Sequence, residues 1–140
     1  MQNKIKVIEV KPNTPPKVIE FEDTLENLQN EVEGIIDMIY IDDEVAIVLN
    51  DEGKIYNLPP NRPLKNERGE VVDVIVGNFL IVGARADSDS FSSLTDEEIK
   101  KYTEEFAEPI KAENEDLYKP LTEPYVDIIP TEWVEWANEK

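Results

Sequence analysis

The sequence predicts an α+β domain with a mainly antiparallel sheet of about five or six strands and one helix packed on it. Short runs of alternating apolar and polar residues, separated by Pro, Asn and Gly, recur through residues 4–84. Helical apolar spacing follows Asp23, and a second helix is predicted at residues 95–108. Acids and prolines then dominate residues 110–140, which predicts a single domain over residues 1–109 and an extended acidic tail.

The N-terminal residues predict a hairpin. Residues 4–10 mix apolar side chains with lysine and glutamate in near alternation, and residues 17–21 form a second strand-like run. Three prolines and an asparagine lie between them in residues 11–16, which favours a turn or loop.

The first predicted helix starts at Asp23. Its carboxylate caps free N–H groups, and Glu26 stands three residues further on, as in a capping box. Apolar residues follow at spacings of three and four, which gives one apolar face (Leu25, Leu28 and Val32). Gly34 is the expected C-cap.

The middle of the chain predicts further strands. Residues 35–41 and 45–49 form two strands around an acidic turn at 42–44, and residues 54–58 add a short third strand. Proline has no N–H to donate, so the proline-rich residues 59–63 form either an ordered loop or an edge.

Residues 71–84 are the most apolar stretch. The Gly77-Asn78 pair predicts a tight turn or a bulge between two strands, and either choice buries residues 79–82 in the sheet.

The second helix has the most specific local signal. Thr95 is the N-cap, Glu98 completes a capping box, and Leu94 with Ile99 matches a hydrophobic staple. Pro109 stops the helix, and its apolar face repeats at helical spacing (Ile99, Tyr102 and Phe106).

The tail contains both tryptophans of the chain. Trp133 and Trp136 stand three residues apart after Thr131, which caps a short helix. They either pack back onto the domain or anchor a partner or a second subunit, since tryptophan dominates interface energetics.

Composition excludes most catalytic chemistry. The chain has no cysteine and no histidine, which excludes disulfides, Ser-His or Cys-His nucleophile systems and His-ligated zinc. The acidic groups at 42–44 and 51–52 either hold a divalent cation or do acid–base work, or are ordinary turn residues, which is the favoured interpretation, and no glycine-rich phosphate loop is present. We therefore expect a protein that is not an enzyme and has no metal site and no cofactor.

The net charge of −18 further restricts the partners. Such a field repels duplex DNA and anionic membranes, and favours solubility or basic partners. No signal peptide or membrane-length apolar run is recognised, so a cytoplasmic location is expected.

One segment departs from this acidity. Residues 53–69 carry four bases against the single acid Glu67, together with asparagine and tyrosine side chains that orient ligands. The segment predicts either an anion-binding site or an ordinary charged surface loop. The candidate ligand-binding residues are Arg62, Asn61, Tyr56, Lys65, Arg68 and Lys54.

Several motifs resemble one known family. They are the opening strand, the predicted helix at 23–34, and residues 42–47, 58–62, 77–83, 93–98 and 106–109, within a resemblance that covers residues 4–109. The family is an uncharacterised domain of unknown function carried by bacteriophages and integrative elements of Gram-positive bacteria, so no catalytic residues carry over.

The resemblance implies a phage or mobile-element accessory protein in the bacterial host cytoplasm. Such proteins often counter host defence. The leading hypothesis is a homo-oligomeric protein that sequesters a small, phosphorylated, nucleotide-type immune signal. The alternative is an acidic interaction protein that inhibits a host defence protein directly, as a DNA mimic does.

Overall fold

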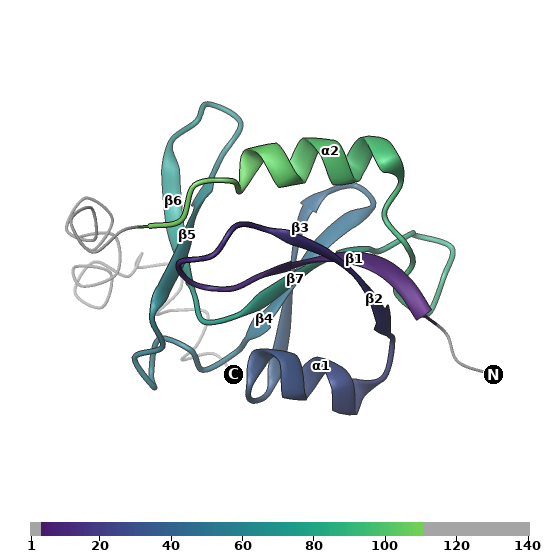
Figure 1. The fold of residues 1–140 in the computed structure, drawn as a ribbon, viewed down its shortest axis with the longest axis horizontal. Helices are drawn as coiled ribbons and strands as arrows, with labels where there is room; N and C mark the ends of the chain where they lie inside the picture. Colours follow the sequence, from purple (N-terminus) through teal and green to yellow (C-terminus); the bar gives the residue numbers. More distant parts are fainter. Residues whose placement is uncertain (1–3, 111–140) are drawn as a thin grey trace, which may run out of the picture.

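The computed structural model describes residues 4–110, and it confirms the α+β fold with a mainly antiparallel sheet (Figure 1). A five-stranded sheet has the order β2-β1-β7-β4-β3, and a separate two-stranded sheet pairs β5 with β6. The strands are β1 (Lys4–Val10), β2 (Lys17–Glu22), β3 (Ile36–Asp42), β4 (Val45–Asn50), β5 (Pro60–Lys65), β6 (Val71–Val76) and β7 (Phe79–Gly83). The helices are α1 (Leu25–Val32) and α2 (Asp96–Glu105).

Strand β7 lies at the centre of the five-stranded sheet. It pairs antiparallel with β1 on one side and with β4 on the other, and all five of its residues are buried. The predicted hairpin of β1 and β2 is confirmed, as is the antiparallel pair β3–β4. Strand β3 forms one edge of this sheet and β2 the other.

The sheet is covered on both faces (Figure 1). Successive side chains of a strand point to opposite faces, so each strand contributes to two cores. In β7, Phe79 and Ile81 join the core under α2, whereas Leu80 and Val82 join the core under α1. The β5–β6 hairpin flanks α2 and contributes Ile75 to the same core.

The ends of α1 differ from the prediction by one residue each. Thr24, not Asp23, is the N-cap, because its Oγ1 accepts from the Asn27 N–H at 3.1 Å. Asp23 instead accepts from the Phe91 N–H, 3.0 Å away. At the other end Glu33, not Gly34, adopts the left-handed conformation, with a φ of 63°. Gly34 is needed for space: a Cβ there would lie 2.6 Å from Asn50 Nδ2.

One prediction in the middle of the chain is wrong, and two open alternatives are decided. Residues 54–58 do not form a strand, because residues 51–57 are a turn in which Asn57 has a φ of 55°. Of the two alternatives for the proline-rich segment, the edge is found, since β5 is a strand of the two-stranded sheet. Gly77, with a φ of 75°, joins β6 to β7, which belong to different sheets, and residues 79–82 are buried as predicted.

Helix α2 begins as predicted and ends early. The capping box of Thr95 and Glu98 is present, and Tyr102 and Phe106 lie in the core with Ile99 packed against them. The helix stops at Glu105, before the predicted residue 108, because the chain turns towards β5, where the Ile110 N–H donates to the Asn61 carbonyl.

The predicted tail and its two tryptophans, Trp133 and Trp136, lie outside the described residues. Neither helix of the described part is long and apolar enough to cross a membrane.

A candidate ligand groove beside strand β3

Three polar side chains are buried among the described residues: Asn50, Asn61 and Arg62. The guanidinium of Arg62 is fully enclosed. Its Nε donates to the Phe106 carbonyl at 2.6 Å, and its Nη2 donates to the Thr14 carbonyl at 2.5 Å. Its Nη1 donates to both oxygens of Asn61, at 3.2 and 2.8 Å. Arg62 therefore joins the β1–β2 loop, β5 and the end of α2.

Asn61 continues this network on the other side. Its Nδ2 donates to the carbonyls of Val10 at 3.0 Å and Gly77 at 2.7 Å. Asn61 thereby ties β5 to β1 and to the residue that joins β6 and β7. A buried amide whose oxygen and nitrogen are both bonded stabilises the contact between the two sheets.

The structure thus places Arg62 and Asn61 in the interior, and not on an accessible loop. The side chain of Arg62 points at the C-terminal end of α2, where a helix carries partial negative charge. Burial lowers the pKa of the Arg62 guanidinium, and the carboxylate of Glu108 opposes that shift. Arg62 and Asn61 both donate hydrogen bonds to main-chain carbonyls of other elements, which gives these two residues a structural role.

Lys54 and Tyr56 lie in the 51–57 turn, away from the other candidates. The Lys54 ammonium forms an ion pair with Asp73 of β6. Tyr56 is exposed, as is its neighbour Ile55. Neither residue lines the same hollow as Lys65 and Arg68.

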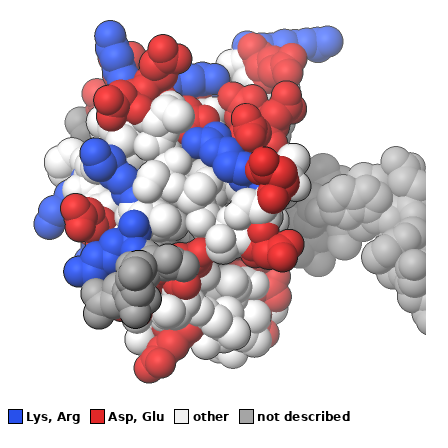
Figure 2. All heavy atoms as spheres, turned by 90° about the vertical axis from the view of Figure 1, so that its right-hand side faces the viewer, with Lys and Arg blue, Asp and Glu red and all other residues white. Residues whose placement is uncertain are grey.

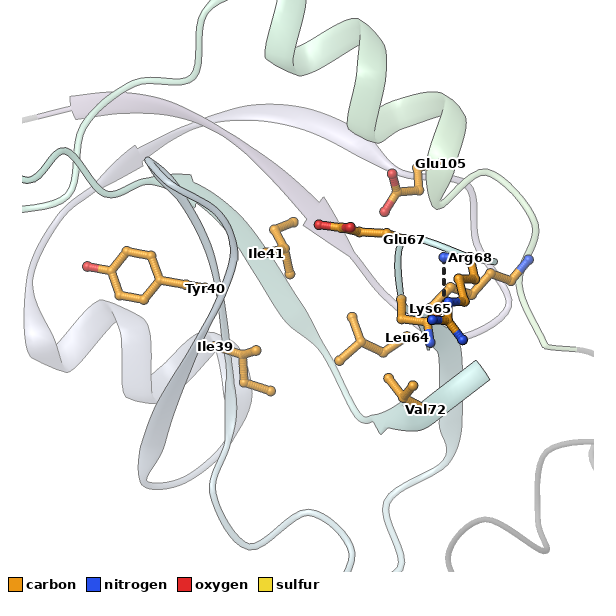
Figure 3. A pocket seen from close by; sticks show the side chains of 10 residues that line it. Ile39, Tyr40, Ile41, Leu64, Lys65, Glu67, Arg68, Val72 and Glu105 are labelled. Carbon is orange, nitrogen blue, oxygen red and sulfur yellow. Dashed lines mark hydrogen bonds between the residues drawn. The ribbon is translucent and has the colours of Figure 1, made fainter. Parts of the chain in front are cut away.

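Lys65 and Arg68 do come together, at a groove of about 600 Å³ between the edge strand β3 and the β5–β6 hairpin (Figure 3). Three consecutive residues of β3, six residues of the hairpin and one residue of α2 line it. They are Ile39, Tyr40, Ile41, Leu64, Lys65, Asn66, Glu67, Arg68, Val72 and Glu105.

The floor of the groove is apolar. Ile41 and Leu64 pack against the core under α2, and Ile39 and Val72 lie beside them in Figure 3. Val72 is 54% exposed, a large value for an aliphatic residue of a strand. Tyr40, also exposed, extends away from the hairpin in Figure 3. The groove therefore offers apolar surface that the described residues do not cover.

The rim of the groove is charged in two parts. Glu67 and Glu105 lie near one another at one end, and Lys65 and Arg68 lie together at the other (Figure 3). Within residues 4–110, neither Lys65 nor Arg68 forms an ion pair. The two cations are thus available to a ligand.

Asn66 holds the hairpin turn that carries these cations. Its Oδ1 accepts from the N–H groups of Arg68 at 2.9 Å and Glu70 at 3.0 Å, and its Nδ2 donates to the Glu70 carboxylate. A side chain that closes its own turn in this way stiffens the loop. Lys65 and Arg68 therefore project from a defined turn.

Sequence reasoning found the two bases and missed the rest of the groove. Ile39, Ile41 and Glu105 come from elements far from the hairpin in sequence, and only the fold brings them together. The sequence does hold one signal: Ile39 and Ile41 flank an exposed tyrosine on a strand that becomes an edge.

Residues 5–107, which are most of the chain, match the sequence model of a protein family that is described as a domain of unknown function. The chain belongs to the DUF3846 family. This confirms the expected membership of an uncharacterised domain family. No curated protein and no solved structure matches the chain. The groove and both helices lie inside the DUF3846 domain, and residues 111–140 lie outside it.

Charge is unevenly distributed over the DUF3846 domain. Residues 18–53, which include β2 after its first residue Lys17 and all of α1, β3 and β4, contain twelve acids and no lysine or arginine. On the face drawn in Figure 2, basic side chains lie among acidic ones in the upper and middle parts, and the charged side chains visible in the lowest part are acidic. Within the described residues, no cluster of three or more acids is arranged to hold a metal ion.

Proposed function

We propose that this DUF3846 protein binds and sequesters a small, phosphorylated, nucleotide-type ligand in the groove beside β3, without converting it. The observation that carries the proposal is the pair of cations, Lys65 and Arg68, that lies next to an uncovered apolar floor without an ion-pair partner in the described part of the chain. A volume of about 600 Å³ is within the range of roughly 300–1,000 Å³ that is typical of small-molecule sites.

Each part of the groove suits one part of such a ligand. Arg68 offers a planar fork of donors that matches a phosphate, and Lys65 adds a point charge. The floor of Ile39, Leu64 and Val72 suits the flat face of a base. Glu67 and Glu105 are acceptors for ribose hydroxyls or for an exocyclic amine.

The overall negative charge does not prevent this binding. The rim contributes two bases and two acids, so its local charge is balanced. At physiological ionic strength the Debye length is about 8 Å, so more distant acids act weakly on a bound phosphate.

Binding without turnover agrees with the side chains available. The chain has no histidine and no cysteine, which are common general bases and nucleophiles. The family resemblance supports a phage or mobile-element setting, in which capture of a nucleotide immune signal in the bacterial host cytoplasm would counter defence.

The acidic segment at residues 18–53 supports a second candidate function. Residues 18–53 present twelve acids and no base, as a protein that binds a basic host defence protein, or mimics DNA, requires. Such binding depends on long-range charge and falls steeply as salt is raised. It does not need the groove, which separates the two candidates.

Titration calorimetry with linear, cyclic and ADP-ribose-type nucleotides tests the first candidate. We expect one class to bind, and we expect the double substitution Lys65→Met/Arg68→Met to weaken binding at least about tenfold, since a hydrogen bond to a charged group contributes about 1.5–3 kcal/mol. The control Lys17→Met/Lys100→Met removes the same charge from exposed sites outside the groove and should bind normally. Unchanged affinity in the groove variant, or no binding by any nucleotide, rejects the proposal.

Two further measurements complete this design. Chromatography of each bound nucleotide after incubation with protein and Mg²⁺ should return it intact, and a product would replace sequestration by catalysis. For the second candidate, capture of a basic host protein that survives Lys65→Met/Arg68→Met and is lost at high salt is the expected result.

A further inference from the structure

We propose that residues 131–136 of the same chain dock in the groove beside β3 when no ligand occupies it. The docking requires only the groove and the C-terminal segment, and it does not depend on the function proposed above. Its regulatory consequence, competition with a nucleotide, rests on the function proposed above.

The first argument is where the chain leaves the domain. Ile110 is buried, and its N–H donates to the Asn61 carbonyl of β5 at 3.1 Å. The same strand supplies Leu64 and Lys65 to the groove. The segment that follows Ile110 is thus tethered to one wall of the groove, which raises its effective concentration there.

The second argument is length. Twenty residues, 111–130, separate Ile110 from the proposed docking segment. At about 3.3–3.6 Å per residue, they span up to about 70 Å when extended. The six-residue strand β5 extends for only about 20 Å, so the tether reaches every part of the groove.

The third argument is chemical complementarity. The docking segment reads Thr-Glu-Trp-Val-Glu-Trp, with Trp133 and Trp136 three residues apart and Glu132 and Glu135 at the same spacing. The groove offers an apolar floor beside two cations that have no ion-pair partner within residues 4–110. Tryptophan on the floor and glutamate on Lys65 and Arg68 would satisfy both parts.

A ligand that binds the same groove then has to displace the segment. Its apparent dissociation constant equals the intrinsic dissociation constant divided by the fraction of molecules in which the groove is free. Weakening the docking segment is therefore expected to tighten nucleotide binding.

Tryptophan fluorescence of the full chain tests the docking directly, because Trp133 and Trp136 are the two tryptophans of the protein. We expect iodide and acrylamide to quench the emission several-fold less than they quench free N-acetyl-tryptophanamide. Val72→Glu, which puts a carboxylate on the floor, should restore several-fold stronger quenching. The matched control Val18→Glu, at a half-exposed position of β2, should not.

Three outcomes overturn the docking. Quenching as efficient as that of the free indole shows that the segment is not docked. Protection that is unchanged in both Val72→Glu and Lys65→Met/Arg68→Met shows that it docks elsewhere. Protection that appears only as the protein concentration rises assigns the contact to a second copy, and also overturns docking within one chain.

The consequence is tested separately with Trp133→Ala/Trp136→Ala. We expect nucleotide affinity to rise several-fold, and unchanged affinity overturns the competition while the proposed ligand site stands. Protected tryptophans in a protein that binds no nucleotide reject the proposed function and leave the docking supported.

Discussion

Helices α1 and α2 pack on opposite faces of one sheet. The C-terminal end of each helix is held by a buried polar side chain from a strand that is distant from that end in sequence. At α1 it is the neutral amide of Asn50, whose Nδ2 donates to the carbonyls of Val32 at 3.0 Å and Glu33 at 3.3 Å. At α2 it is the guanidinium of Arg62, which donates to the Phe106 carbonyl. Helix ends leave carbonyls without partners, and each of these side chains supplies donors.

The two layers differ in how charge is used. Around α2, Arg85 forms a two-pronged ion pair with Glu98 at 2.8 and 2.9 Å, and the Tyr102 hydroxyl donates to Asp42 at 3.0 Å. No ion pair of the described residues involves α1. There Glu31 lies close to Glu9, and one of its carboxylate oxygens is buried without a partner.

The comparison separates two tasks. Paired charges fasten the α2 layer, whereas apolar burial and one amide hold the α1 layer. The predictions below weaken one layer at a time.

The largest effect is expected from Arg62→Met. The change keeps the aliphatic volume, removes the guanidinium that joins the β1–β2 loop to the end of α2, and leaves the carbonyl of the buried residue Phe106 without this donor, which should lower the free energy of unfolding by about 3–5 kcal/mol. Urea unfolding measures it, with the exposed Arg68→Met as a control that changes stability by less than about 0.5 kcal/mol. If Arg62→Met folds with normal stability and loses nucleotide binding, Arg62 is a ligand residue after all.

Asn50→Ala should have the next largest effect. It leaves the Val32 and Glu33 carbonyls at the end of α1 without the amide, at a cost of about 2 kcal/mol. Hydrogen exchange should show α1 opening while α2 keeps its protection, because the Asn50 amide donates to the α1 end and its Oδ1 accepts from Glu52 in the following turn, with no contact to α2. Equal loss of protection in both helices would show that the layers are not independent.

The N-terminal caps should give smaller effects. Thr95→Ala removes half of a capping box, and Thr24→Ala removes a single cap bond, so each should cost about 1 kcal/mol with the larger loss at α2. Thermal unfolding at neutral pH compares them, with Thr14→Ala as a control outside both helices. A larger loss of stability for Thr24→Ala than for Thr95→Ala would contradict this expected order.

The smallest effect, and the one that separates the layers most clearly, is pH. Burial, together with the nearby Glu9 carboxyl, raises the pKa of Glu31 from 4.5 to about 7; Lys11 lowers it and Glu33 raises it. The folded protein therefore holds this proton more tightly than the unfolded chain. The resulting stability is complete below pH 4.5 and is lost as the pH rises through about 7.

The pKa shift of Glu98 has the opposite direction, and so has its effect on how stability depends on pH. The hydrogen bond from Arg85 lowers the pKa of Glu98 below 4.5, so its contribution is present above that pH and is lost as the pH falls. The free energy of unfolding should thus fall by about 1 kcal/mol between pH 5.5 and 8.5, a value that allows for solvent screening. Glu31→Gln should abolish this fall, and Glu98→Gln should leave it unchanged. A decline that persists in Glu31→Gln would assign it to another group.

Much of the fold was readable from local patterns. The alternation in residues 4–10 and 17–21 predicted the hairpin, and the Thr95–Glu98 pair predicted the start of α2, because period and capping depend on neighbouring residues alone. The apolar run at 79–82 predicted the buried central strand. The end of α2 at Glu105 was missed because a distant group takes part, the Asn61 carbonyl that accepts from the Ile110 N–H. The turn at 51–57 was missed although its backbone hydrogen bonds are local.

The candidate site shows the same division. The sequence by itself determined that a basic segment exists in an acidic chain that lacks histidine and cysteine. Only the tertiary structure decided that Arg62 and Asn61 turn inward, while Lys65 and Arg68 line a groove with Ile39 and Glu105. The physical reason is that a side chain's partner is set by which strands and helices meet, and contacts between residues forty or more positions apart leave no local pattern.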